Sequence, residues 1–178
     1  MSLREIVTVP EPVLRRKAQK VTSFGADLQK LIDDMIETMR DAPGVGLAAP
    51  QVDVPQRVVV VEYSETEEDE EDGEEVQKIP PKLFAVVNPE ITRSSTETVL
   101  GPEGCLSIPG FLGEVNRSVS VTVKGLNRHG KPVKIKAEGW LARIFQHEID
   151  HLDGVLFTDR AERIWKSEEE PRQAVPAD

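Results

Sequence analysis

The stretch Gln146-His147-Glu148-Ile149-Asp150-His151 contains the spacing H-E-x-x-H. On a helix, residues four positions apart lie on one face, one turn above the other, so His147 and His151 can hold one metal ion between them. Glu148 directly follows the first histidine and lies close enough to reach a water molecule on that metal. Two imidazole ligands and one carboxylate base are the minimum for metal-assisted hydrolysis, and the remaining question is the third ligand.

A third ligand can come only from the single cysteine, from His129 or from a carboxylate. Cys105 lies in the small-residue segment Glu103-Gly104-Cys105-Leu106-Ser107, where a turn can point its side chain into a cleft. A thiolate is a strong ligand that leaves a divalent site electropositive enough to acidify water. A lone cysteine is more often a small buried hydrophobic residue, so core packing is the alternative. The combined pattern favours a Cys-His-His site, and His129 is expected in an exposed turn.

The composition indicates one globular domain without a membrane span. A chain of 178 residues can bury its own core, and 38% hydrophobic and 30% charged residues are ordinary values. No apolar run approaches the roughly 20 residues that cross a bilayer, and the N-terminus lacks an apolar secretory segment. We therefore expect a cytoplasmic protein, and its one cysteine excludes an intrachain disulfide.

The net charge of -10 comes from one segment. Residues 62–75 hold ten acidic residues, and without them 22 acidic residues face 22 Lys and Arg. No basic stripe suggests direct nucleic-acid binding. We expect a single domain over residues 1–166, with an acidic loop insert at 62–79 and a polar tail at 167–178.

Hydrophobic periodicity predicts both helices and strands. Helical spacing indicates an amphipathic helix over 26–40 and the metal-binding helix over 140–152, which Gly154 ends. A short helix is expected around 13–18, and another near the C-terminus from the spacing of Phe157, Ala161, Ile164 and Trp165. β-branched runs predict strands over 57–63, 83–93, 96–100, 115–124 and 131–138.

A glycine-bearing loop, Gly44-Val45-Gly46-Leu47-Ala48-Ala49-Pro50-Gln51, precedes the first of these strands. It lacks the glycine spacing, the lysine and the preceding strand of a phosphate-binding loop. Its small residues allow a ligand to approach the backbone closely, and Gln51 can donate a side-chain N–H to a developing oxyanion. Taken alone, the loop is a weak signal, and a plain turn is the better interpretation.

Together the three segments resemble the signature motifs of the peptide deformylase family. They are the glycine-bearing loop 44–51, the cysteine segment 103–107 and the helix segment Gln146-His147-Glu148-Ile149-Asp150-His151-Leu152-Asp153-Gly154, in the family's order. The resemblance spans about residues 7–163. It implies a bacterial or organellar type of enzyme that removes the N-formyl group from the initiator methionine of nascent chains and releases formate. It also implies an α+β fold, with mixed and antiparallel sheets around a central helix carrying H-E-x-x-H and with N-terminal and C-terminal helices.

The same resemblance implies the roles of individual residues. Cys105, His147 and His151 are expected to bind one divalent metal, iron(II) in the cell, with zinc, nickel or cobalt as substitutes. Glu148 is expected to be the general acid and base. Gln51 and the Leu106 backbone N–H are expected to bind the formyl oxygen.

Position beside the motifs suggests the substrate contacts. Glu103 and Arg117 are expected to pair near the cleft, with a plain surface ion pair as the alternative. Apolar residues beside the motifs, including Leu106, are expected to form the walls of a slot for the substrate methionine. Ordinary core packing is the alternative for these residues. The full set of expected substrate-binding residues is Gly44, Val45, Gly46, Glu103, Gly104, Arg117, Trp140, Arg143 and Ile144.

Two other functions stay open at this point. An H-E-x-x-H metallopeptidase would take its third ligand downstream, where Asp159 and Glu162 are the nearby carboxylates. A non-catalytic metal-binding module would need a closed site with four ligands, and no convincing fourth is present. The expected partners are N-formylmethionyl nascent peptides, and a monomer is expected. The acidic tail weakens the case for ribosome docking through a basic C-terminal helix, so transient ribosome contact is left open.

Overall fold

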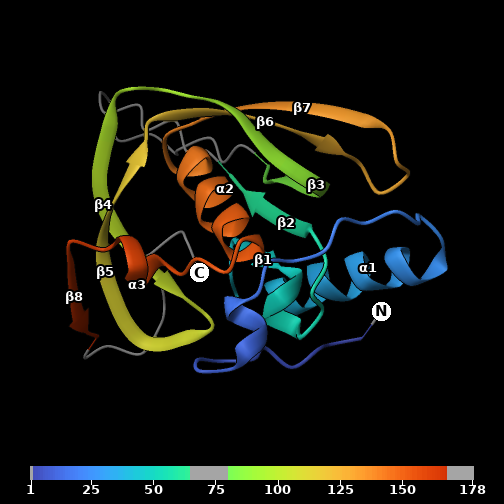
Figure 1. Ribbon diagram of the computed structural model, residues 1–178, viewed down its shortest axis with the longest axis horizontal. Helices are drawn as coiled ribbons and strands as arrows, with labels where there is room; N and C mark the ends of the chain where they lie inside the picture. The colour runs from blue at the N-terminus through green and yellow to red at the C-terminus, as the bar shows by residue number, and fades with distance from the viewer. Residues whose placement is uncertain (1, 65–79, 168–178) are drawn as a thin grey trace.

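The structure is a computed structural model that describes residues 2–64 and 80–167 (Figure 1). Most of the predicted acidic loop and nearly all of the predicted polar tail therefore lie outside the described residues. Glu62 and Tyr63 are described, and they belong to a strand rather than to a loop. Within the described ranges, no helix is both long enough and apolar enough to cross a membrane.

The larger of two sheets has five antiparallel strands in the order β1-β2-β3-β6-β7. The second strand of this order, β2, separates two apolar clusters of the core, because successive side chains of a strand point to opposite faces of the sheet. Val58 and Val60 pack in one apolar cluster, and Val59 and Val61 pack in another. The strands are β1 Gly46–Ala48, β2 Val58–Tyr63, β3 Lys82–Ser94, β6 Ser120–Leu126 and β7 Pro132–Glu138.

Two helices cover the two faces of this sheet. Helix α1, Ala26–Asp41, contributes its buried side chains to the cluster that contains Val58 and Val60. Helix α2, Gly139–Leu152, contributes to the cluster that contains Val59 and Val61. A run of four buried valines thus produces a helix–sheet–helix sandwich with the H-E-x-x-H helix on one side.

The second sheet has three antiparallel strands in the order β4-β5-β8. They are β4 Thr98–Cys105, β5 Ile108–Ser118 and β8 Arg163–Lys166. Figure 1 shows helix α2 in the middle of the molecule, between this sheet and the five-stranded one. Helix α2 contacts strands of both sheets, so the sequence motif on that helix meets residues from each. The predicted α+β architecture with antiparallel sheets is confirmed.

Most predicted elements are present, and several are corrected in their bounds or type. The strand predicted over 115–124 is two strands, β5 and β6, separated at Val119, whose N–H bonds to Glu97 O. The glycine loop contains strand β1 and the 3-10 helix η2, Ala49–Val52. The 3-10 helix η1, Pro12–Arg15, is shorter than the helix predicted around 13–18.

The helix predicted from Phe157 to Trp165 is wrong beyond its first turn. Helix α3 covers only Phe157–Arg160, and the chain then pairs with β5 as strand β8. Leu112 faces Trp165 and Gly113 faces Ile164 across the ladder. The edge of β5 offers backbone hydrogen bonds to a segment with β-branched and aromatic side chains, and this pairing outweighs the apolar spacing.

Candidate metal centre

The structure brings Cys105, His147 and His151 together. Cys105 ends strand β4, and the two histidines lie one turn apart on helix α2. One ligand atom from each residue lies within 4.8 Å of the other two, and all three residues are buried. The sequence spacing therefore corresponds to a real cluster, built from strand β4 and helix α2.

The spacing of these atoms fits a tetrahedral metal. His147 Nε2 and His151 Nε2 are 3.3 Å apart, and Cys105 Sγ is 3.4 Å from His151 Nε2. Ligand bonds typical of zinc, meeting at a tetrahedral angle, put two nitrogens about 3.3 Å apart and a nitrogen and a sulfur roughly 3.6 Å apart. Burial, together with the nearby His147 and Arg117, holds the pKa of His151 well below its usual range, so its imidazole is neutral and offers a lone pair.

A buried carboxylate orients the first histidine. Glu103 Oε1 lies 2.9 Å from His147 Nδ1, so an Nδ1–H donates to the carboxylate and Nε2 keeps its lone pair toward the ligand cluster. Burial alone would raise the pKa of Glu103, but hydrogen bonds from Arg117 and His147 hold it well below its usual range. The carboxylate is therefore ionised beside the metal site.

Two arginines hold that carboxylate in place. Arg117 donates to both oxygens of Glu103 at 2.9 Å, and Arg143 Nη1 donates to Oε2 at 2.6 Å. Arg143 also donates to the carbonyls of Val115 and Val99. The side chains of both arginines are only 4% exposed, so the expected Glu103–Arg117 pair is a buried one and not a surface pair.

Glu148 lies beside the ligands on the same helix. Its Oε1 is 3.7 Å from His147 Nε2, and its side chain is fully buried. Gly46 of strand β1 packs directly on it: a Cβ at position 46 would lie 2.9 Å from Glu148 Cγ and 3.1 Å from Ile144 Cγ2. The glycine predicted to allow close approach therefore accommodates the carboxylate side chain itself.

Gln51 reaches the same cluster from helix η2. Its Oε1 accepts a hydrogen bond from Ala48 N at 3.0 Å, which fixes the amide orientation. Its Nε2 then donates toward Ser107 Oγ at 3.2 Å and lies 3.6 Å from Cys105 Sγ. An N–H donor of Gln51 thus lies beside Cys105, where it can meet a developing negative charge.

Comparison with known proteins agrees with this geometry. The sequence profile of the polypeptide deformylase family matches residues 3–167. The chain belongs to the polypeptide deformylase family. It is 52% identical to a peptide deformylase of Symbiobacterium thermophilum over 92% of this chain and 69% of the relative. This family membership makes it a hydrolase that removes N-formyl groups from nascent peptides.

Solved structures of deformylases share the fold. The crystal structure of the enzyme from Thermotoga maritima is 42% identical and gives a TM-score of 0.78, covering 92% of this chain and all of that one. A structure of the Acinetobacter baumannii class I type b enzyme bound to Met-Ala-Ser is 38% identical, with a TM-score of 0.79 over 90% of this chain and 99% of that chain. The similarity therefore covers both sheets and the central helix.

The residues expected to contact substrate in this deformylase have different environments. Gly44 follows helix α1, and its N–H is bonded to Met39 O. Trp140 is 36% exposed at the start of α2, and the Arg143 guanidinium lies 5.3 Å from its ring centroid. Ile144 is fully buried, whereas Val45 and Leu106 are half-buried against the core clusters. Gly104 is buried in strand β4, next to Cys105.

The other candidates for the third metal ligand lie outside the cluster of Cys105, His147 and His151. Asp159 pairs with Arg15 and accepts a hydrogen bond from Leu156 N. Glu162 accepts one from Asn116. His129 is exposed in its turn, as predicted. None of the three belongs to the metal cluster found among the described residues.

Two residues that sequence reasoning did not single out complete the deformylase site. Ser107 is fully buried and accepts the Gln51 amide. Asp150 accepts hydrogen bonds from Arg117 at 2.7 Å and from Arg160 at 2.6 Å, and so joins strand β5 to helix α2. Both residues lie inside the quoted motifs. For Asp150, the sequence feature that could have indicated a role was a polar residue between the two histidines.

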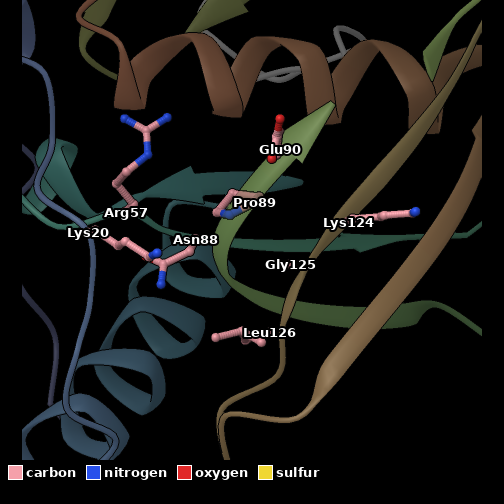
Figure 2. A pocket seen from close by; sticks show the side chains of 8 residues that line it. All are labelled: Lys20, Arg57, Asn88, Pro89, Glu90, Lys124, Gly125 and Leu126. Carbon is pink, nitrogen blue, oxygen red and sulfur yellow. The ribbon is translucent and has the colours of Figure 1, made fainter. Parts of the chain in front are cut away.

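A surface pocket of about 520 Å³ lies apart from this site. Its lining includes Lys20, Arg57, Asn88 and Lys124, and it shares no residue with the metal cluster (Figure 2). Asn88 is occupied with the backbone of Val21, to which it both donates and accepts. The pocket therefore does not belong to the catalytic centre.

Proposed function

We propose that Cys105, His147 and His151 bind one divalent metal and that the surrounding residues use it to hydrolyse N-formylmethionyl peptides. The observation that carries the proposal is the three-atom ligand cluster with Glu148 Oε1 at 3.7 Å from His147 Nε2. When bound, the metal supplies a Lewis-acidic centre with an open position for water. Only three ligands cluster in the described part of the chain, which argues against a closed structural site.

Glu148 acts as the general base and then as the general acid. Its carboxylate takes a proton from the water that attacks the formyl carbon. The C–N bond then breaks, and the same carboxyl returns the proton to the departing amine, leaving formate and a free N-terminus. Full burial of the side chain supports this role, because a carboxyl away from bulk solvent keeps its proton for the leaving group.

Gln51 and the backbone N–H of Leu106 stabilise the oxyanion that forms on the formyl oxygen. The Gln51 amide is held by Ala48 N, so its donor is already oriented before substrate arrives. Leu106 follows the ligand Cys105 in the chain, so its N–H belongs to the backbone next to the metal. Loss of one such donor typically lowers the rate about 10²–10³-fold.

Two strand edges support binding of an extended peptide. Strand β1 ends the five-stranded sheet, and strand β4 ends the three-stranded sheet. Unpaired edges can accept the backbone of a peptide as an additional strand, while side-chain pockets give specificity. We assign the methionine slot to Val45, Leu106, Trp140, Arg143 and Ile144. The Acinetobacter relative bound to Met-Ala-Ser is consistent with a peptide of this kind.

The same proposal extends to the identity of the metal, the cellular location, the oligomeric state and contact with the ribosome. One thiolate and two imidazoles suit iron(II), zinc, nickel and cobalt, and we assign iron(II) in the cell. The substrates are nascent chains, so we place the enzyme in the cytoplasm as a monomer, with transient contact with the ribosome.

Formate release from N-formyl-Met-Ala-Ser tests the proposal. The protein is loaded with iron(II) under anaerobic conditions or with nickel in air, and compared with Glu148→Ala and with the exposed-residue control Glu90→Ala. Metal-dependent release should persist in the control and fall about 10²–10⁴-fold or more in Glu148→Ala, which should keep its metal. Cleavage of internal peptide bonds without formate release would instead identify a metallopeptidase.

A further inference from the structure

The N-terminal segment of residues 7–18, here called the strap, crosses all three sequence motifs. Val7 N donates to Gln51 O at 2.8 Å, Val9 N donates to Ser107 O at 2.9 Å and Ala18 N donates to Leu152 O at 2.8 Å. The three acceptors lie in the glycine loop, the cysteine segment and the metal-binding helix, in that order. A single run of chain therefore connects three segments, each about 50 residues from the next in the sequence.

The first two contacts close a ring of hydrogen bonds that passes through Gln51 and Ser107. Residues 7–9 join the main chains of Gln51 and Ser107, while the side chains of these two residues are joined directly, from Nε2 to Oγ at 3.2 Å. Gln51 and Ser107 are fully buried. The Gln51 amide is oriented by Ala48 N, and its position also depends on its own backbone, on Ser107 and on the two strap N–H groups that hold both.

The far end of the strap is fixed to the metal-binding helix. Leu152 O accepts both Ala18 N and Arg57 Nη1, the latter at 2.9 Å. Figure 2 shows Arg57 pointing toward the end of that helix. Gly154 packs on the strap as well: a Cβ there would lie 2.5 Å from Arg15 O, and its φ is +74. The strap is therefore anchored independently of the oxyanion site.

We propose that Val7 and Val9 are positioning residues for the oxyanion site. Their N–H groups set the separation between Gln51 and the cysteine segment, and so the place where the Gln51 amide meets the formyl oxygen. The inference rests on the oxyanion role proposed for Gln51. A misplacement of about 1 Å in a catalytic donor can lower a rate by about 100-fold, so two hydrogen bonds outside the reacting atoms are sufficient to matter.

Proline at position 7 removes one strap N–H. Val7→Ala controls for the lost side chain, and Thr8→Pro controls for proline itself, because the Thr8 N–H makes no hydrogen bond within the described part of the chain. Each variant is made in the wild-type and in the Gln51→Ala background. The kcat and KM for formate release, the bound metal and the melting temperature are measured for all of them.

Val7→Pro should lower kcat by about 10-fold or more relative to both controls, with KM within about twofold and metal content unchanged. In the Gln51→Ala background the same substitution should lower kcat by less than about twofold, because the donor that it misplaces is already absent. If Val7→Pro does not fold, a backbone ester at residue 7, introduced by cell-free translation, removes the N–H alone and should show the same pattern.

An equal loss of kcat in both backgrounds would overturn the proposal and leave the strap a purely structural segment. So would a Val7→Pro enzyme as active as Val7→Ala, or a Gln51→Ala enzyme as active as the wild type. Absence of formate release from the metal-loaded wild-type protein would instead refute the proposed function, so the two failures are distinguishable.

Discussion

Glu103 Oε1 lies 2.9 Å from His147 Nδ1, although the two residues are 44 positions apart in the chain. The carboxylate is the central member of a short path of hydrogen bonds that runs from Arg117 and Arg143 to His147, the proposed metal ligand. Such outer partners fix the tautomer and the ring orientation of a ligating histidine. Glu103 therefore controls which nitrogen of His147 faces the cluster.

Substitution Glu103→Gln should weaken metal binding. The amide keeps the shape of the side chain but not the charge that balances two buried guanidinium groups. We expect the metal dissociation constant to rise about 10–100-fold, measured by competition with a chelator of known affinity. Glu114→Gln is the matched control, since Glu114 is 35% exposed and pairs with Arg163 only at 3.7 Å. An unchanged dissociation constant in Glu103→Gln would show that the ion cluster only supports the fold.

Substitution Cys105→Ser should reduce metal content more strongly than loss of an outer partner. A serine hydroxyl is a poor replacement for a thiolate on iron(II) or zinc, so affinity should fall by more than the roughly 10–100-fold of an outer-shell change. The measurement is the ratio of metal to protein after dialysis against a chelator. Equal ratios in variant and wild type would remove Cys105 from the ligand set.

Substitution Gly46→Ala should impair turnover without touching a ligand. The new methyl group would lie 2.9 Å from Glu148 Cγ, and the buried carboxylate side chain would have to move. Overpacking of this kind costs about 1–3 kcal/mol and should lower kcat through Glu148. Gly25→Ala is the control, because the nearest atom to its Cβ, Ser23 Oγ, is 3.9 Å away. A Gly46→Ala enzyme with wild-type kcat would mean that Glu148 tolerates displacement.

Asp34 should make stability depend on pH below the neutral range. Its buried carboxylate accepts hydrogen bonds from Ser2 N, Arg4 Nε and Lys30 Nζ at 2.9, 3.0 and 2.9 Å. Burial raises the pKa of Asp34, but these hydrogen bonds outweigh it and hold the pKa well below its usual range. A carboxyl with a lowered folded pKa stabilises the protein above the unfolded value of about 4, and this contribution is lost as the pH falls through the folded value.

We therefore expect Asp34→Asn to lower the free energy of unfolding by about 1–3 kcal/mol at pH 7, and by less as the pH falls below about 4. Urea unfolding at several pH values measures this difference. The exposed Asp41→Asn, at the end of the same helix, should change the free energy by less than about 0.5 kcal/mol. A difference for Asp34→Asn that stays constant down to pH 3 would contradict the electrostatic explanation.

The metal-binding helix was predictable because the residues that indicate it lie close together in the sequence. Helical geometry alone brings residues four apart onto one face. The spacing of His147, Glu148 and His151 in the sequence was therefore sufficient to predict their arrangement. The helix over 140–152 and most strands followed from apolar periodicity in the same way. Cys105 was predictable as a candidate ligand because the chain has no other cysteine and the resemblance to deformylases indicated its role.

Non-local pairing decided the rest. Strand β8 forms where periodicity predicted a helix, because the edge of β5 offered backbone partners that no local pattern records. The two arginines on Glu103, the Asp150 bridge and the strap across the three motifs each join residues that are distant in sequence. The sequence by itself determined which side chains could bind a metal and attack an amide. Only the packing of two sheets around one helix decided how those side chains are oriented and held, since that depends on contacts between segments that local geometry does not relate.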